Sequence, residues 1–430
     1  MTTSRTAREG DPLSAARGVC PVDLLGSPRF HTDPPAQYAE MRREHGAVVP
    51  VDLAGFPGWL VIGYRELLQV CRDPELFQRD VGLWNQWENV PADWPLRPML
   101  GQRSPSIYFT VGEEHRRHQR MVGAVLEAGD PYALRRGSEA LADRLIDTFC
   151  GRGTADLVAE YAKILPTLVL AEIIGFPDRD GPVIARLIAA LADGGPDAQE
   201  AHIGFVRRMG DLLALKRDQP GDDVASRMLA HDSSPDEPFT EEEIIEDLCA
   251  LTAAGHLNTS DWIGNTVRLM LTDDRFMAAL GGARHSIPEV MNEVLWEDGP
   301  TQILANRFAA RDTTLGGHLV RAGDLVLLGF GGANTDPHVR QGLPALGSGH
   351  APSANGAHLA FGQGEFRCPF PAQEIAEVIA RTGIEVLLDR LPDVELAVPA
   401  ESLVRRASPF LRGFTALPVR FTPVRPVGDS

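Results

Sequence analysis

Long apolar runs are missing from this sequence of 430 residues. No stretch approaches the roughly 20 apolar residues that a membrane-spanning helix needs, and residues 1–18 lack the apolar core of a secretion signal. The sequence therefore predicts a cytoplasmic protein that does not insert into a membrane.

Positive charge is also scarce, with 41 Lys and Arg residues against 59 Asp and Glu residues and a net charge of -18. Only Lys163 and Lys216 are lysines. Nucleic acids and anionic membrane surfaces attract basic proteins, so this balance argues against nonspecific binding to either. The expected partner is a diffusible small molecule.

The sequence has few cysteines, and their spacing does not indicate a metal-binding site. The five cysteines stand at positions 20, 71, 150, 249 and 368, with no CxxC pair and no zinc spacing. Four of them are expected to be ordinary small hydrophobic residues. Cys368 differs because of the residues around it.

Most of the sequence shows the periodicity of hydrophobic residues that is typical of helices. Helical patterns dominate residues 113–270, whereas β-rich runs are confined to residues 47–53, 58–62 and 305–330. We therefore expect a mainly α fold with a small β lobe.

Residues 81–109 hold three tryptophans and four prolines and predict a long irregular loop. We expect Trp84 to Phe109, together with Pro177 to Leu215, to shape a pocket for an apolar or aromatic guest.

One helix is predicted to be exceptionally long. Thr240 and Glu243 form a capping box, after which the helical pattern continues for about 30 residues, or about 48 Å. Its centre, residues 253–256, reads Ala-Ala-Gly-His. Glycine in a helix interior is unfavourable, so either a flat ligand or a crossing helix is expected to approach Gly255.

Residues 361–368 read Phe-Gly-Gln-Gly-Glu-Phe-Arg-Cys, and a helical run over residues 372–388 follows. A cysteine at the start of a helix is placed where backbone N–H groups stabilise a thiolate. A thiolate is the form in which cysteine ligates haem iron.

With this loop, nearly the whole chain resembles a cytochrome P450 of the soluble actinobacterial type. Further matches are Glu293 to Trp296, Gly332 to Pro337 and Glu114 to Arg117, all in the family's order. The resemblance implies a cytochrome P450 fold, with residues 1–20 as a disordered head and residues 21–425 as one haem-binding domain. It also implies haem b, O2 as oxidant, and electrons from NAD(P)H through ferredoxin reductase and ferredoxin.

The resemblance assigns site residues by position in the motifs. Cys368 is the expected iron ligand. The other expected cofactor-binding residues are His115, Arg307, Phe361, Gly362 and Gly364. On the oxygen side, the expected residues are Gly255, which leaves room for oxygen, with Asn258 and Thr259.

Several positions depart from the family pattern around oxygen. Leu257 and Asn258 replace the acid-alcohol pair that relays protons, and neither side chain titrates near neutral pH. Thr259 stands one position later, so a turn of about 100° is expected to direct it away.

Other departures lie near the cofactor. Trp296 replaces the arginine that pairs with Glu293, with Arg340 as a possible substitute. Gln119 and Phe366 replace two propionate donors, for which Arg117 or Arg120 is expected to compensate partly. Phe370 replaces a glycine, and Pro369 and Pro371 lack N–H groups, so fewer donors are expected at the sulfur.

The expected activity is insertion of oxygen from O2 into a small organic molecule, as in secondary metabolism. Two alternatives remain open at this point. One is a haem protein without standard turnover, such as a peroxide-driven enzyme, an isomerase-like catalyst or a ligand sensor. The other is a haem-free helper of another biosynthetic enzyme. For ferredoxin, a basic patch of Arg117, Arg120 and Arg367 is expected.

Overall fold

The computed structural model describes the chain from residue 21 to residue 428 with internal gaps. The described residues are 21–24, 27–92, 94, 96–100, 104–193, 198–231, 238–273, 287–340 and 355–428. The predicted disordered head, residues 1–20, lies outside them.

Helices form most of the described chain. They are α2 (Arg29–Thr32), α3 (Pro34–His45), α4 (Tyr64–Arg72), α5 (Arg97–Leu100), α6 (Gly112–Glu127), α7 (Pro131–Asp147), α8 (Ile164–Ile174), α9 (Gly181–Asp193), α10 (Ala198–Asp218), α11 (Val224–Ala230), α12 (Glu241–Thr272), α14 (Ile287–Glu297), α15 (Phe330–Asn334), α16 (Pro337–Arg340) and α17 (Phe370–Arg390). Within the described residues, none of these helices has the length and apolar character needed to cross a lipid bilayer.

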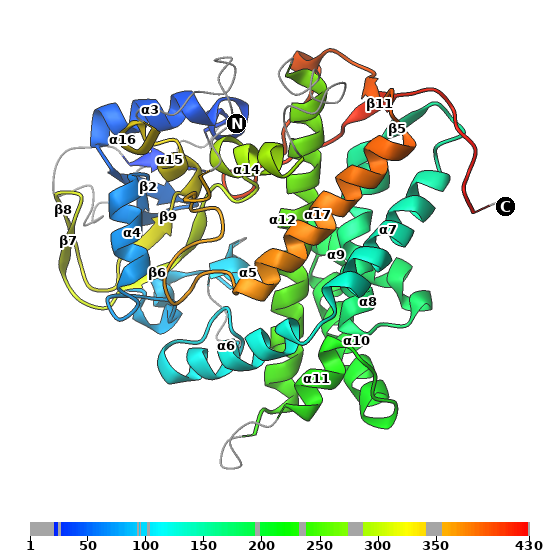
Figure 1. Ribbon diagram of the computed structural model, residues 1–430. Helices are drawn as coiled ribbons and strands as arrows, with labels where there is room; N and C mark the ends of the chain where they lie inside the picture. Colours follow the sequence, from blue (N-terminus) through cyan, green and yellow to red (C-terminus); the bar gives the residue numbers. More distant parts are fainter. Residues whose placement is uncertain are drawn as a thin grey trace, which may run out of the picture.

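Most of the strands form a small separate lobe, as predicted. The strands are β1 (Val22–Asp23), β2 (Val48–Leu53), β3 (Phe56–Val61), β4 (Phe77–Gln78), β5 (Thr154–Asp156), β6 (Leu304–Ala309), β7 (Thr313–Leu315), β8 (His318–Val320), β9 (Leu325–Leu328), β10 (Glu395–Leu396) and β11 (Pro418–Arg420). The main sheet has the order β1-β2-β3-β9-β6-β4. Antiparallel β2 and β3 pair Val48 with Val61, and β3 pairs with β9 in parallel. Strands β5, β10 and β11 form a second sheet beside α7 and α17 (Figure 1), which the sequence did not predict.

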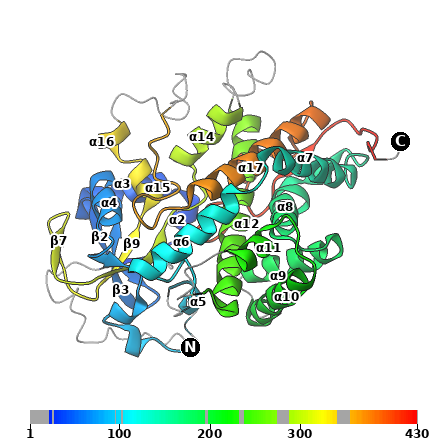
Figure 2. The same cartoon turned by 60° about the horizontal axis from the view of Figure 1, so that its bottom comes forward.

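The helical side of the molecule is built around α12. Figure 1 shows α7, α8, α12 and α17 together on one side and the strand lobe on the other, and Figure 2 shows α6 beside α17. A large apolar core joins these helices, with buried residues that include Tyr161, Leu165, Ile263 and Ile384.

The predicted capping box at the start of α12 is confirmed. The Thr240 hydroxyl accepts a hydrogen bond from the Glu243 N–H at 3.2 Å, while the Glu243 carboxylate accepts one from the Thr240 N–H at 2.7 Å. The helix then runs for 32 residues, or about 48 Å, and positions its centre beside the cysteine loop.

Trp296 at the end of α14 joins this helix to the segment that leads into the cysteine loop. Its indole N–H donates to the Asn355 carbonyl at 2.7 Å, and its buried ring packs edge-on against His358 at 5.9 Å. An aromatic side chain therefore holds this junction by packing and one hydrogen bond. The side chain of Arg340, the possible substitute for the family's arginine, lies outside the described residues.

We expect Trp296→Ala to lower the free energy of unfolding by about 3–5 kcal/mol, because it leaves a large cavity at this junction. Trp296→Phe keeps most of the packing and loses the hydrogen bond, for an expected loss of about 1–2 kcal/mol. Urea unfolding measures both. Trp87→Phe is the matched control, since Trp87 is half-buried and contacts Arg97 at the surface. An alanine variant as stable as the wild type contradicts the anchoring role.

Candidate functional site

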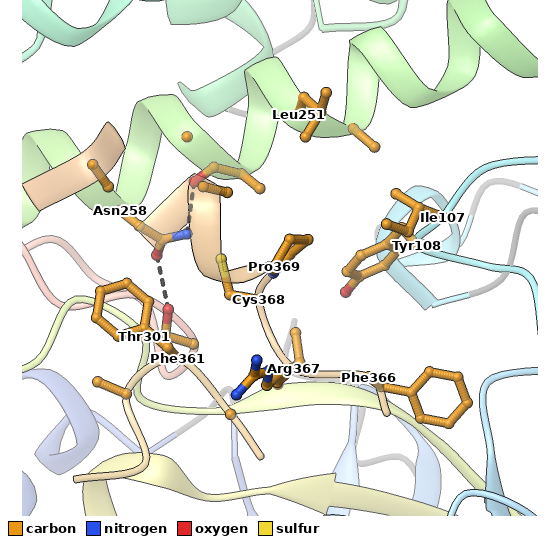
Figure 3. Close-up of a pocket in the computed structure, with 18 of the residues that line it drawn as sticks. Ile107, Tyr108, Leu251, Asn258, Thr301, Phe361, Phe366, Arg367, Cys368 and Pro369 are labelled. Atoms are coloured by element: carbon orange, nitrogen blue, oxygen red, sulfur yellow. Dashed lines mark hydrogen bonds between the residues drawn. The ribbon is translucent and has the colours of Figure 1, made fainter. Parts of the chain in front are cut away.

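A cavity of about 270 Å³ lies between α12, the start of α17 and the strand lobe. Cys368 forms one wall, and Gly255, Asn258 and Thr259 of α12 form another. Figure 3 shows the Cys368 sulfur directed toward the helix that carries Asn258. The structure thus brings together the predicted iron ligand and the predicted oxygen-side residues, which are more than 100 positions apart.

Two glycines shape the loop that carries the cysteine. Gly362 and Gly364 have φ values of 72° and 73°, a region that favours glycine. A Cβ on Gly364 would lie 2.0 Å from the Cys71 carbonyl oxygen, so no other residue fits there without moving α4. The Cys368 N–H donates to the Phe361 carbonyl at 2.9 Å and closes the loop.

Cys368 lies just before a helix N-terminus, as expected, and the prolines next to it leave few N–H donors for its sulfur, also as expected. Helix α17 begins two residues later, at Phe370, and Pro369 and Pro371 have no N–H to offer. Burial raises the pKa of the thiol to about 11, although Arg367 acts in the opposite direction. A positively charged ligand at the sulfur is therefore needed to hold the thiolate at neutral pH.

Two arginines are fully buried in the wall of the cavity on the strand-lobe side. Arg307 on β6 donates to the Asn306 backbone and side-chain oxygens at 3.1 and 2.7 Å, and Arg79 donates to backbone carbonyls, including that of Phe366 at 2.8 Å. The Nε of each has no partner, and neither pairs with a carboxylate among the described residues. Burial lowers the pKa of Arg79 to about 10, and burial and repulsion from Arg79 lower that of Arg307.

Phe366 fills the space between these basic groups. Its ring lies 4.7 Å from the Arg79 guanidinium, 4.6 Å from that of Arg307 and 4.9 Å from the His115 ring. His115 hydrogen-bonds the Ile107 carbonyl at 3.0 Å, and burial lowers its pKa to about 4, so the imidazole is neutral. The ring thus replaces a polar donor with cation–π contacts.

The expected compensation by Arg117 or Arg120 is wrong. Arg117 is mostly buried and pairs with Glu243 of α12, while Arg120 pairs with Glu113 on the surface. Neither lines the cavity. The same ion pairs contradict the predicted basic patch of Arg117, Arg120 and Arg367, because Arg117 is not free to meet a partner. The buried arginine that does line the cavity beside Arg307 is Arg79, and no motif in the sequence pointed to it.

At the centre of α12, a crossing helix packs close to Gly255, and the approach of a flat ligand stays a prediction. A Cβ on Gly255 would lie 3.1 Å from the end of the Leu170 side chain of α8, so close helix packing favours a small residue here. Gly255 also lines the cavity. Thr259 is buried and still borders the cavity, so the expectation that it turns away is wrong.

Asn258 is held by two hydrogen bonds. Its Nδ2 donates to the Ala254 carbonyl at 3.0 Å, and its Oδ1 accepts from the Thr301 hydroxyl at 2.8 Å. The second bond, dashed in Figure 3, links α12 to the segment between α14 and β6. Thr301 was missed by sequence reasoning because its role depends on this tertiary contact.

Most described residues of the two segments expected to shape the substrate pocket, Trp84 to Phe109 and Pro177 to Leu215, do not line the cavity. Trp84 and Trp94 are buried against Phe56 and Phe308 in the strand lobe, so of that loop only Ile107 and Tyr108 line the cavity among the described residues. No described residue of 177–215 lines it. Helix α8 and Val224 do so instead.

The residues of this cavity fit haem b. Haem carries two propionate carboxylates and an iron that accepts a thiolate. The cavity offers a cysteine on one wall and, on another, two buried guanidinium groups that have no acidic partner in the described chain. Because an uncompensated buried charge is strongly unfavourable, the site calls for an anionic ligand.

Known proteins were compared with the whole chain, and no protein-family model matches it. Cytochrome P450 107B1 from Saccharopolyspora erythraea is 30% identical over 407 residues, which cover 94% of this chain and 98% of the relative. The vitamin D(3) 25-hydroxylase from Pseudonocardia autotrophica is 29% identical and covers 93% of this chain and 96% of the relative. The solved structure of CYP154C4 from Streptomyces sp. W2061 has a TM-score of 0.82 at 27% identity, covering 93% of this chain and 98% of that chain.

These similarities extend over almost the full length of each protein and include the cavity with its cysteine. Family members bind haem through a cysteine thiolate, act on small organic molecules and receive electrons from redox partners. The chain belongs to the cytochrome P450 family of haem-thiolate monooxygenases.

Proposed function

We propose that residues 21–425 act as a single haem-binding domain in which Cys368 ligates the iron and an apolar small molecule is oxygenated next to α12. The observation that carries this proposal is the pairing, in one cavity, of the Cys368 thiol with two buried arginines that have no acidic partner among the described residues.

The other cofactor contacts follow from the same geometry. Arg307 and Arg79 would face the propionates. The single N–H of neutral His115 is donated to the Ile107 carbonyl, so this residue would border the cofactor with its ring. Gly362 and Gly364 give the cysteine loop its backbone shape, and Phe361 packs edge-on against Trp262 of α12 at 5.9 Å. These contacts fix the position of the cysteine and would hold the cofactor beside it.

When bound, the haem iron activates O2 for insertion of one oxygen atom into the substrate. The balance is one substrate, one O2, two electrons and two protons, giving a hydroxylated product and one water. We propose that NAD(P)H supplies the electrons through ferredoxin reductase and ferredoxin. A cytoplasmic location stays a prediction from the sequence.

The substrate side of the cavity supports an apolar guest. Its described lining comes from α8, α12 and residues 300–304 and contains no charged side chain. Leu170, Ile173, Leu251 and Leu304 are typical of these walls. A free carboxylate or ammonium group placed here would lose its hydration without gaining a counter-charge.

A second candidate is a peroxide-driven reaction at the same haem, and Leu257 with Asn258 favours it. Neither residue can deliver a proton from its side chain. Peroxide brings both oxygen atoms and their protons with it, so this route depends less on a proton relay.

One comparison tests both candidates: product formation driven by NADPH against product formation driven by hydrogen peroxide. We expect haem-loaded protein to consume NADPH and form product with ferredoxin and its reductase from an apolar cyclic substrate, and to be slower with hydrogen peroxide. Product formed only with peroxide would favour the second candidate. If the purified chain takes up no haem after supplementation, both are wrong and a haem-free helper role gains support.

A further inference from the structure

The oxygen side of the cavity is apolar except at one point. The described lining on this side comes from α8, α12 and residues 300–304. The residues in it that carry a hydroxyl or amide side chain are Asn258, Thr259 and Thr301. Asn258 and Thr301 hydrogen-bond each other at 2.8 Å, so they form one polar unit where α12 meets the segment after α14.

The hydrogen bonds fix the polarity of this unit. The Asn258 amide donates to the Ala254 carbonyl at 3.0 Å and accepts from the Thr301 hydroxyl. The flipped amide would place two oxygens 3.0 Å apart, so only one orientation is favourable. The Thr301 proton is therefore committed to Asn258, while one Asn258 N–H and the Thr301 oxygen lone pairs remain for a ligand.

This leaves one donor next to one acceptor, and apart from Thr259 the described walls around them are apolar. An alcohol is the ligand class that satisfies both, because its oxygen accepts from the Asn258 N–H and its proton is donated to Thr301 Oγ1. A carbonyl satisfies only the donor. A hydrocarbon displaces water from both groups and satisfies neither, which is unfavourable for this half-buried polar pair.

We propose that Asn258 and Thr301 form a specificity-determining pair that selects neutral substrates carrying a hydroxyl group on an apolar skeleton. The proposal rests on the proposed function in that the cavity is taken to hold haem and substrate together. It adds the class of substrate, which neither the fold nor the family membership supplies.

The pair also accounts for the departure at position 258. An alcohol side chain at this position has a single O–H. If its oxygen accepted from Thr301 and its proton were donated to the Ala254 carbonyl, as Asn258 does with one N–H, no donor would remain for a ligand. The amide retains a donor, since it has two N–H groups and a carbonyl. The side chain at position 258 is thus suited to recognising a functional group of the ligand by hydrogen bonds rather than to relaying protons.

The test compares two ligands with the same apolar cage, 1-adamantanol and 1-fluoroadamantane, by isothermal titration calorimetry on the haem-loaded protein. The fluoro compound keeps the shape and lacks the hydroxyl proton. We expect the alcohol to bind about 10- to 100-fold more tightly. In Asn258→Leu and in Thr301→Val the preference should fall below about threefold, with little change in affinity for the fluoro compound.

Thr252→Val is the matched control, because Thr252 lies on the same helix, is buried and donates to the Leu248 carbonyl at 2.7 Å. It should keep the wild-type preference. The proposal is overturned if the alcohol fails to bind, if both ligands bind equally to the wild type, or if either pair variant keeps the preference.

Failure of this inference can be told apart from failure of the proposed function. The spectrum of the reduced, carbon monoxide-bound protein reports the haem-thiolate site in every variant, independently of which ligand is preferred. A normal spectrum with no alcohol preference overturns the substrate class alone. An absent haem-thiolate spectrum in the wild type overturns the proposed function.

Discussion

Replacing Cys368 with alanine should abolish the haem-thiolate spectrum and reduce product formation by at least about 100-fold, or about 2.7 kcal/mol of transition-state stabilisation. The cavity then has no thiolate at the position that faces α12. In the reduced, carbon monoxide-bound protein, the Soret band should move from a strongly red-shifted position to the ordinary position of a neutral-ligand haem. Absorption spectroscopy on the purified variant measures this directly.

The chain offers a matched control in Cys71, a second cysteine that lines the same cavity and is buried on α4. Burial raises the pKa of the Cys71 thiol as well, so burial alone does not distinguish the two residues. Cys71→Ala should keep the red-shifted band and cost about 1 kcal/mol of stability. If Cys71→Ala loses the band and Cys368→Ala keeps it, the ligand assignment is wrong.

The parts of the site that the sequence predicted correctly are those encoded by local signals. The capping box of Thr240 and Glu243 fixed where α12 begins, and a long uninterrupted helical pattern then determined its reach. The spacing of Gly362, Gly364 and Cys368 likewise describes a loop whose backbone shape depends on its own residues. Such features need no knowledge of distant segments.

The parts that were missed depend on contacts between distant segments. Arg79 follows a two-residue strand and resembles any strand-end arginine, yet the carbonyls of Ile107, Tyr108 and Phe366 hold it in the cavity wall. Thr301 becomes informative only when paired with Asn258, 43 positions earlier. Neither contact leaves a periodic pattern in the sequence.

The prediction that the tryptophan-rich loop lines the pocket was mostly wrong for a related reason. Its composition correctly indicated buried aromatic bulk, and Trp84 and Trp94 are indeed buried. Composition does not say which face of the sheet receives that bulk. Contacts with Phe56 and Phe308 place the rings in the core of the strand lobe, and the cavity is lined by the end of the loop instead.

Replacing Arg307 with methionine should change the stabilities of the haem-free and haem-loaded proteins in opposite directions. Arg307 is fully buried, has no carboxylate partner in the described chain and lies close enough to Arg79 to repel it. Without haem, its removal should raise the free energy of unfolding by about 1–3 kcal/mol. With haem, loss of the charge facing a propionate should speed haem transfer to excess apomyoglobin by at least about tenfold.

Arg405→Met is the control, because Arg405 is also largely buried but pairs with Asp298 at 2.6 Å. Removing it costs Asp298 one charged hydrogen bond while Arg268 and Arg412 still pair with it, so both forms should lose about 1–3 kcal/mol of stability. Urea unfolding of the two haem-free variants measures their free energies of unfolding. The rate of haem transfer to apomyoglobin is measured for the same two variants loaded with haem. A haem-free Arg307→Met protein that is less stable than the wild type, with an unchanged transfer rate, would show that Arg307 serves the core alone.

The opposite signs expected for Arg307→Met distinguish a ligand-binding arginine from a structural one. A structural cation is compensated inside the fold, as Arg268, Arg405 and Arg412 are by Asp298, and its loss weakens every state. Within the described chain Arg307 has only neutral acceptors, so its charge should disfavour the protein until an external carboxylate binds. The free energy that the haem-free fold loses to this charge is recovered when haem binds, which makes haem uptake and the final stability of the fold parts of the same equilibrium.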